Sequence, residues 1–407
     1  WLLDEKKAFI LLAELKESMM NAEATVRKRF TPLPVWVEKN YPKNPLKKDG
    51  TEAAIMGKHR DQGFHHNSQG SYGVFEYPIF NLGSRQQIGR YLIHFGWKPT
   101  EFTETGLPKI DEKVLEDVNI PEAVMIKEFL LLQKRVGMVL SWVESVADDG
   151  RVHGYVNAIG AQTNRMTHSS PNVAQVPASY SPYGKECREC WIVPKGYKLV
   201  GCDASGLELR MLAHYMNDEE YINQIIDGDI HSYNQEMAGL PSRDQAKTMI
   251  YALCYGAGDV KMGTIINGSA AEGKQLKATL FNNIPSLADL ITKIKKASNR
   301  GYLKGLDGRK IWVRSEHSAP NFLLQSAGAI VMKKALVLLY NSAKEEKLDF
   351  TFVGNIHDEY QTQVLEAHSE RFGVLAVEAI INAGVALNMN CPLDGESKIG
   401  NNWYECH

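Results

Sequence analysis

Two acidic segments of the sequence have the residue types that a divalent metal site needs. In the first, Asp203 follows an apolar run that includes Leu199 and Val200, so it stands at the end of a predicted strand and before a predicted helix. In the second, residues 357–359 read His-Asp-Glu between two further predicted strands. Acidic residues are depleted inside strands, and Mg²⁺ prefers oxygen ligands. Both segments are therefore candidate metal ligands.

Each acidic segment also has a simpler explanation. An aspartate such as Asp203, taken alone, is more often a helix N-cap than a metal ligand, and residues 357–359 could be an exposed turn. Considered together, Asp203 and Asp358 come from separate strands, as a two-metal site requires. Such a site holds two cations about 3.5–4 Å apart and stabilises the attacking and leaving oxygens of phosphoryl transfer.

A third segment carries cations and aromatic rings at helical spacing. Arg243, Lys247, Tyr251 and Tyr255 are four residues apart, so they share one face of a helix. Cations suit the phosphates of a triphosphate, and rings suit a stacked base. The alternative is a surface stripe of long side chains, which the order of cations followed by rings disfavours.

Composition narrows the class of protein. The 407 residues suit two to three domains, and 44% hydrophobic with 23% charged residues is typical of a globular protein. Six cysteines are too few for a disulfide scaffold and indicate a reducing compartment. We find no apolar run that predicts a membrane-spanning helix and no secretory signal. The expected location is therefore cytoplasmic, with no membrane partner.

The charge balance argues against a simple histone-like DNA binder, because the chain has 46 basic and 48 acidic residues. It does not exclude a nucleic-acid enzyme, which needs acidic residues at a metal site and basic residues elsewhere. Locally, residues 25–66 are basic, and the prolines and glycines of residues 31–79 predict a long loop. That basic loop is either functional or a solvated insertion.

The elements that must position these residues give an α+β fold. Apolar spacing predicts a long helix over 2–30, and Pro121 begins a second. The remaining predicted elements are a strand at 196–202, helices at 205–216 and 242–254, and two strands at 350–356 and 360–364.

The three segments occur in an order that resembles motifs A, B and C of family A DNA polymerases. Residues 203–210 are similar to motif A, residues 243–256 have the spacing of motif B, and residues 357–359 resemble motif C. Four further segments resemble the T-seven-like phage replicative branch of that family, at 228–231, 305–310, 323–329 and 402–407. The resemblance covers nearly the whole chain, and residues 31–79 match poorly.

The resemblance implies a right-hand polymerase fold with thumb, palm and helical fingers. The thumb would be residues 1–148, with the basic insertion at 31–79. The palm, built on an antiparallel sheet, would be 149–215 with 302–407, and the fingers 216–301. No exonuclease domain is expected in this chain, so proofreading would come from a truncated part or from a separate exonuclease subunit.

The resemblance also implies roles at the metal site. Asp203, Asp358 and the backbone carbonyl of Ala204 would hold two Mg²⁺ ions, and Glu359 would be an auxiliary carboxylate. Lys247 would contact the triphosphate and protonate the pyrophosphate leaving group.

Further roles follow for nucleotide and DNA. Arg243 and His231 would contact the triphosphate, Tyr251 the sugar and base, and Tyr255 the templating base. Glu208 would occupy the space of a 2′-hydroxyl and so select deoxynucleotides. Four residues would read the minor-groove acceptors at the primer end: Arg165, Arg309, Gln325 and His357.

The implied function is template-directed addition of deoxynucleotides to a primer 3′-end. The implied partners are primed DNA template, dNTPs and a processivity factor, thioredoxin-like or other, at 31–79. One alternative is a single-subunit RNA polymerase, which Glu208 disfavours. The other is a catalytically idle DNA-binding or assembly module, which the intact Asp203 and Asp358 disfavour.

Overall fold

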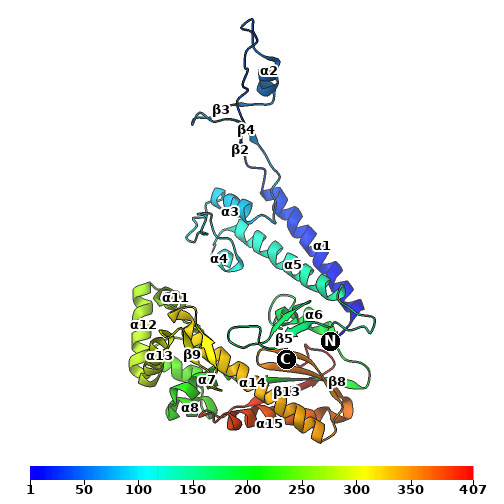
Figure 1. Cartoon of the computed structure of the whole chain (residues 1–407), viewed down its shortest axis with the longest axis vertical. Helices are drawn as coiled ribbons and strands as arrows, with labels where there is room; N and C mark the ends of the chain where they lie inside the picture. The colour runs from blue at the N-terminus through cyan, green and yellow to red at the C-terminus, as the bar shows by residue number, and fades with distance from the viewer. Residues whose placement is uncertain (117, 407) are drawn as a thin grey trace. The chain divides into compact units, whose positions relative to one another are not determined.

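The computed structural model describes residues 1–116 and 118–406, which form two compact units (Figure 1). Residues 10–140 form one, which we call the N-terminal unit. Residues 1–9 and 141–407 form the other, which we call the sheet unit.

The N-terminal unit is built on two long helices. As the sequence predicts, these are α1 (Glu5–Arg29) and α5 (Pro121–Val143), and α5 begins with a proline that suits the first helical turn. Val26 and Phe30 pack with Phe129 in one apolar core. Its smaller helices are α3 (Arg85–His94) and α4 (Glu112–Glu116).

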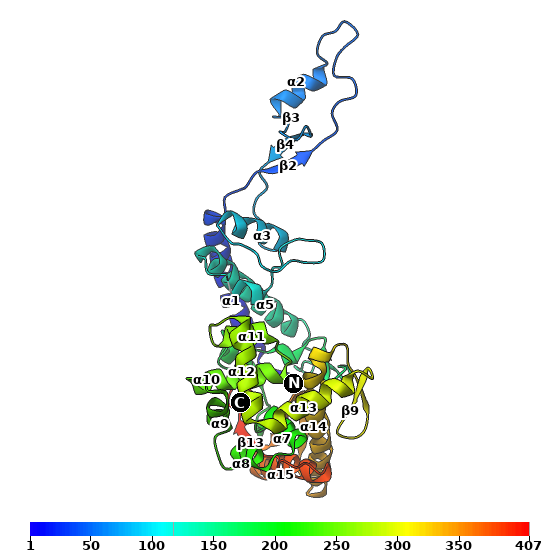
Figure 2. The ribbon, with the colours of Figure 1, turned by 90° about the vertical axis from the view of Figure 1, so that its left-hand side faces the viewer.

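Residues 31–79 are not the simple loop that their prolines and glycines predict. They contain a three-stranded antiparallel sheet in the order β2-β4-β3, and Figure 2 shows a short helix, α2, beside it. The strands are too short for their alternation to stand out among the breakers, and α2 has no buried residue. The elements of this segment are β2 (Val35–Glu38), α2 (Ala54–Asp61), β3 (His65–His66) and β4 (Tyr72–Glu76).

The sheet unit contains a four-stranded antiparallel sheet in the order β11-β12-β8-β13. Its strands are β8 (Tyr197–Ala204), β11 (Phe350–Ile356), β12 (Glu359–Leu365) and β13 (Gly395–Gly400). The sequence predicts three of them closely: apolar residues dominate β8 and β11, and in β12 they alternate with polar ones. Strands and helices are mixed along the chain, which confirms the expected α+β class.

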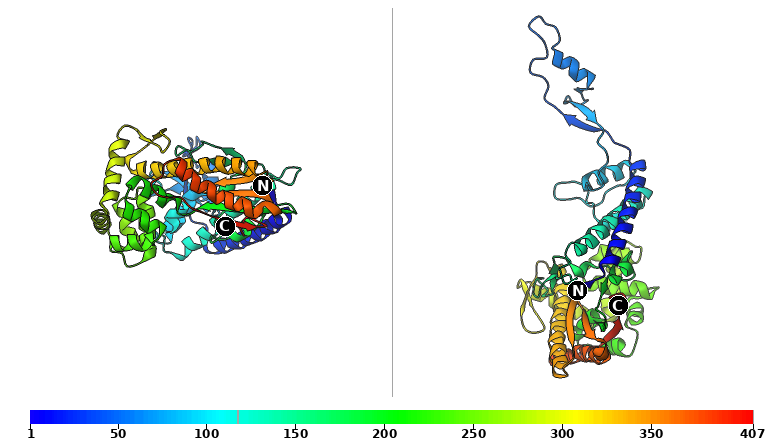
Figure 3. Two further views of the ribbon diagram at one scale, coloured as in Figure 1. Left: turned by 90° about the horizontal axis from the view of Figure 1, so that it is seen from below. Right: turned by 90° about the vertical axis from the view of Figure 1, so that its right-hand side faces the viewer.

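Two long helices cover one face of this sheet. They are α14 (Ala319–Glu345) and α15 (Ser369–Ala386), which run beside each other (Figure 3). The buried Tyr360 of β12 points toward α14, and its hydroxyl donates a 2.7 Å hydrogen bond to the Met332 carbonyl. Alternate residues of β12 therefore face the opposite side of the sheet.

The helix α14 corrects one expectation from the sequence. Within the helical span 316–345, one window is long and apolar enough to cross a membrane by length and composition. Because 61% of that window is buried inside the protein, its apolar residues are explained as part of the core.

Beyond the sheet lies a group of helices between residues 207 and 298. Several have strong caps: Ser242 accepts a bond from the Gln245 amide at the start of α10, and Ser269 with Glu272 forms a capping box on α12. The helices are α7 (Leu207–Met216), α8 (Glu219–Ile226), α9 (Ile230–Ala238), α10 (Arg243–Cys254), α11 (Asp259–Ile265), α12 (Ala270–Asn283) and α13 (Pro285–Ser298).

Short elements complete the sheet unit. Three antiparallel strand pairs lie outside the main sheet. They are β1 (Leu2–Leu3) with β7 (Trp191–Ile192), β5 (Tyr155–Asn157) with β6 (Thr167–Ser169), and β9 (Tyr302–Lys304) with β10 (Lys310–Trp312). The helix α6 (Gly184–Glu189) precedes β7.

Candidate active site

The structure brings the acidic segments together at one end of the main sheet. Asp203 is the last residue but one of β8, and in the strand register it lies opposite Glu359 of β12. The Ala204 amide donates a 3.0 Å hydrogen bond to the carbonyl of Asp358, in the turn between β11 and β12. Asp203 and Asp358 are therefore cross-strand neighbours.

Glu359 differs from its neighbour Asp358 and from the turn residue that the sequence predicts. It is the first residue of β12, and its side chain is buried. Its Oε1 atom accepts hydrogen bonds from the Trp403 indole at 2.6 Å and from the Gln361 amide at 2.5 Å. Glu359 is thus held inside the protein, while Asp203 is exposed.

The donor atoms at the strand ends fit a magnesium site. Asp203 and Asp358 offer carboxylate oxygens, and Ala204 can add a backbone carbonyl. Within residues 1–116 and 118–406, no group of three or more His, Cys, Asp or Glu side chains is arranged to enclose a metal. Mg²⁺ sites that share ligands with substrate phosphates use one or two carboxylates rather than a full protein cage, so the set fits.

The Tyr251 end of α10 lies near the acidic residues of the site. Arg243 and Lys247 are exposed near its start, and Tyr251 is half-buried farther along. Burial raises the pKa of Tyr251, and the nearby negative charges of Glu208 and Asp358 raise it further. The predicted stripe therefore runs from exposed cations to rings beside the acidic residues.

Glu208 connects three parts of the site. It lies in the first turn of α7 and accepts a 2.8 Å hydrogen bond from the Tyr255 hydroxyl. The Arg165 guanidinium lies 3.5 Å from the same carboxylate oxygen. Partial burial, followed by the contact with Glu208, raises the pKa of Tyr255 to about 12, so this phenol stays protonated.

The start of α10 is joined to the start of α9. Asp229 caps α9 and receives a 2.7 Å bond from the Arg243 Nε atom. The Arg243 guanidinium holds the pKa of Asp229 well below its usual range. Burial, together with the charges of Arg243 and Lys247, lowers the pKa of His231. Arg243 and Lys247 make this the cationic end of the site.

Arg165, which precedes β8 in the chain, lies near the turn that contains His357. Desolvation and the Arg165 charge lower the pKa of His357, and both residues line a small pocket with Lys333. Asn164 has a φ of 60°, a left-handed conformation that asparagine tolerates well. Its amide donates to Ser326 at 3.4 Å on α14.

Two other predicted DNA contacts lie near this group. Arg309, in the β9–β10 hairpin, forms an ion pair with Asp307, with 2.8 Å between Nε and Oδ2. Burial and the Arg309 charge lower the pKa of Lys333. Gln325 is half-buried on α14, beside Ser326. The structure therefore gathers the predicted DNA-contacting residues on the sheet unit.

Sequence reasoning missed three residues that contact predicted site residues or their neighbours. Asp229 restrains Arg243, Trp403 holds Glu359, and Lys333 donates a 2.5 Å hydrogen bond to the Asn164 carbonyl. An aspartate is a common helix N-cap, so Asp229 before the helical residues 230–238 was a usable signal for that helix start. The sequence carries no local signal for the other two, because their partners are distant along the chain.

Carboxylates at adjacent strand ends, facing a helix that carries cations and rings, define a site suited to phosphoryl transfer from a nucleotide. Comparisons with known proteins show the family to which the chain belongs. The sequence-family model for DNA polymerase family A matches residues 56–405. The chain therefore belongs to DNA polymerase family A, as its motifs indicate.

Relatives and solved structures place the chain more closely. It is 39% identical over 409 residues to the DNA-directed DNA polymerase of Enterobacteria phage T3, and 38% over 412 residues to that of Escherichia phage T7. Each match covers 90% of this chain and 57% of the phage protein, so the chain spans just over half of their length.

A solved structure confirms the expected right-hand polymerase fold. The POL domain of Pol1 from M. smegmatis, in complex with DNA primer-template and dNTP, matches with a TM-score of 0.81 and 21% identity. The match covers 100% of this chain and 67% of that one.

Proposed function

We propose that this chain is a template-directed DNA polymerase that adds deoxynucleotides to a primer 3′-end and releases pyrophosphate. The observation that carries the proposal is that Asp203, opposite Glu359 in the strand register, and Asp358, bonded through its carbonyl to the Ala204 amide, meet at one end of the sheet. The cation and ring stripe of α10 and the membership in family A support it.

Asp203, Asp358 and the Ala204 carbonyl would hold two Mg²⁺ ions. When bound, the metal lowers the pKa of a coordinated hydroxyl and offsets the charge of the phosphates. The protein fixes Asp203 near the end of β8 and Asp358 in the adjoining β11–β12 turn. Glu359 supports this arrangement from inside the protein.

The cationic end of the site would bind the triphosphate. Arg243 and Lys247 are exposed, and charge-assisted hydrogen bonds to phosphate are strong. His231 adds a donor, and Lys247 would pass a proton to the pyrophosphate. Arg243 is paired with Asp229, so part of its charge becomes available to phosphate when that pair opens.

The rings would bind the nucleoside. Tyr251 would lie under the sugar and base, and Tyr255 near the templating base, since aromatic rings stack on any base. Glu208, held by Tyr255 and Arg165, would fill the space that a 2′-hydroxyl needs.

The group around His357 would contact the primer end. Arg165, Arg309, Gln325 and His357 would donate to minor-groove acceptors, which all correct base pairs share. This allows a check of pairing without reading sequence.

We also propose that the chain has the three polymerase subdomains that its resemblance to the family implies. Residues 1–148 would be the thumb, 149–215 with 302–407 the palm, and 216–301 the fingers. A processivity partner, thioredoxin-like or other, would bind at 31–79, and a separate exonuclease subunit could join. The protein would act in the cytoplasm of a host cell.

The exposed apolar side chains of residues 31–79 support a partner there. Tyr77 and Ile79 are 63% and 72% exposed, and Leu46 is 59% exposed. Exposed apolar residues that gather in one segment mark interaction sites.

Primer extension tests the function. A labelled primed template is incubated with Mg²⁺ and one dNTP at a time, then with dNTP and NTP in competition. Addition of the deoxynucleotide complementary to the template base supports the proposal. Preference for NTPs would favour an RNA polymerase, and bound but unextended primer would favour an idle module.

A further inference from the structure

The acidic hairpin of the site includes a buried carboxylate, Glu359, that the proposed function does not count among the metal ligands. Glu359 lies one residue after Asp358 and opposite Asp203 in the strand register. Its side chain is buried and points away from α14, on the face of the sheet opposite to Tyr360. Any movement of Glu359 would therefore be passed to both metal-binding positions.

Trp403 holds this carboxylate. Its indole Nε1 donates to Glu359 Oε1 at 2.6 Å, a charge-assisted bond of the stronger kind. The Gln361 amide donates to the same oxygen at 2.5 Å, which leaves the carboxylate little freedom to rotate.

The indole of Trp403 is itself fixed from several sides. It is 1% exposed and stacks on Trp1 with ring centroids 4.9 Å apart. The Arg188 guanidinium lies 4.6 Å from its ring, a favourable cation–π distance. Its backbone amide donates to the carbonyl of Trp191 at 3.0 Å. A side chain held in this way can act as a rigid support.

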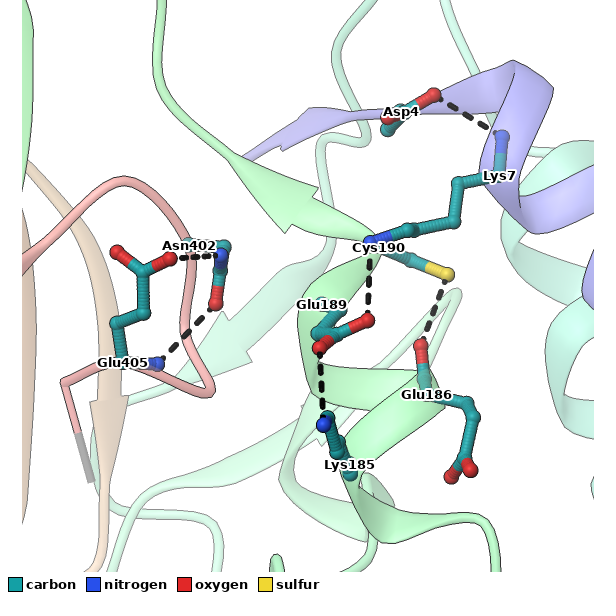
Figure 4. Close-up of polar contacts among 8 residues, drawn as sticks. All are labelled: Asp4, Lys7, Lys185, Glu186, Glu189, Cys190, Asn402 and Glu405. Atoms are coloured by element: carbon teal, nitrogen blue, oxygen red, sulfur yellow. Dashed lines mark hydrogen bonds and ion pairs between the residues drawn. The ribbon is translucent and has the colours of Figure 1, made fainter.

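The turn that carries Trp403 is also braced. Asn402 and Glu405 exchange hydrogen bonds: the Asn402 amide donates to the Glu405 carboxylate at 2.9 Å, and the Glu405 backbone amide donates to the Asn402 side chain at 3.1 Å. Figure 4 shows this pair on its turn, apart from the contacts of Lys185, Glu189 and Cys190 at the end of α6.

We propose that Trp403 is a positioning residue for the metal site, acting through Glu359. Its indole donor keeps the Glu359 carboxylate inside the protein, and this holds the start of β12 in the register that sets Asp358 beside Asp203. Without the donor, the buried carboxylate lacks one of its hydrogen bonds and turns toward water at the hairpin end. This inference rests on the proposed function for the identity of the metal site.

Trp403→Phe tests the inference, because it keeps the ring and removes the donor. Residues that orient metal ligands typically change metal affinity by 10–100-fold, so we expect roughly tenfold weaker Mn²⁺ binding by electron paramagnetic resonance in the absence of DNA. The Mg²⁺ concentration for half-maximal primer extension should rise by a similar factor.

Trp191→Phe is the matched control. Trp191 is a buried neighbour of Trp1 in the same cluster, and its indole nitrogen has no hydrogen-bond partner among the described residues. This variant should bind Mn²⁺ as the wild type does, and the melting temperatures of both variants show whether loss of packing alone explains a result.

A double variant tests the route through Glu359. If Trp403 acts through this carboxylate, adding Trp403→Phe to Glu359→Gln should change Mn²⁺ affinity less than it does in the wild type. Should Trp403→Phe fail to fold, Glu359→Gln alone still tests the pair, and it should weaken Mn²⁺ binding.

Unchanged Mn²⁺ affinity in a folded Trp403→Phe variant, or equal losses in the Trp191→Phe control, would overturn the inference. If Trp403→Phe does not fold, unchanged Mn²⁺ affinity in Glu359→Gln would also overturn the inference. Failure of the wild type to extend primers would instead count against the proposed function, and the Mn²⁺ comparison would remain valid.

Discussion

The adjacent carboxylates at positions 358 and 359 have different surroundings, although the sequence presents them as one acidic pair. Asp358 lies in the turn, partly exposed, whereas Glu359 is the first residue of β12 and is buried against Trp403. One residue of register separates a side chain that can meet a metal from one that supports the strand. The residue types indicate metal chemistry, and the position of each carboxylate relative to the strand indicates which of the two can reach a metal.

At the same scale, Glu208 should control the choice of sugar. We expect Glu208→Ala to weaken discrimination against NTPs by roughly 10–100-fold, because a pocket that excludes one small group is worth about 1–3 kcal/mol. Single-nucleotide incorporation with competing dNTP and NTP measures this ratio.

Tyr255→Phe is the control for Glu208→Ala. It removes the 2.8 Å hydrogen bond between Tyr255 and Glu208 without opening space beside the sugar. Discrimination should be retained. Equal loss in both variants would show that the hydrogen bond matters, and not the filled volume.

Among the elements, α10 was the most predictable. Four-residue spacing predicts a helix at 242–254, and the structure has Arg243–Cys254, capped by Ser242. The sheet was predictable to a similar degree, because apolar runs mark β8 and β11 as strands, and alternating aromatic or β-branched residues mark β12. What the sequence could not supply were pairings between distant residues, such as Trp403 with Glu359, since only the folded chain brings them together.

The exposed face of α10 should bind the triphosphate. A hydrogen bond to a charged group is worth about 1.5–3 kcal/mol, so Lys247→Ala should lower kcat/KM for dNTP by roughly 10–100-fold. Steady-state incorporation measures this value.

Thr248→Ala is the matched surface truncation on the same helix. The Thr248 hydroxyl donates to the Asp244 carbonyl of its own helix, at 2.9 Å. This variant should keep the kcat/KM of the wild type. If the two variants lose activity alike, the phosphates are not bound by the stripe that contains Lys247.

At the scale of the whole molecule, function depends on where charge and apolar surface lie. The formal net charge is only −2, so binding of a polyanion needs local cations such as those of α10. The six cysteines are buried. Exposed apolar residues are found in the small sheet at 31–79.

Deleting residues 40–70 tests the role of that small sheet. The deletion leaves β2 and β4, which pair directly, so the ends to be joined are neighbours. We expect shorter products in single-encounter extension, with single-nucleotide addition retained. The assay is run with and without thioredoxin. Unchanged product length under both conditions would reject a role in processivity.

The central claim is that Asp203 and Asp358 form the metal site of a DNA polymerase, and one measurement tests it most directly. The wild type and Asp358→Ala are compared in extension of a labelled primed template with Mg²⁺ and all four dNTPs, beside a binding assay for the same template. We predict extension by the wild type alone, with equal template binding by both proteins. Extension by Asp358→Ala at the rate of the wild type would contradict this account.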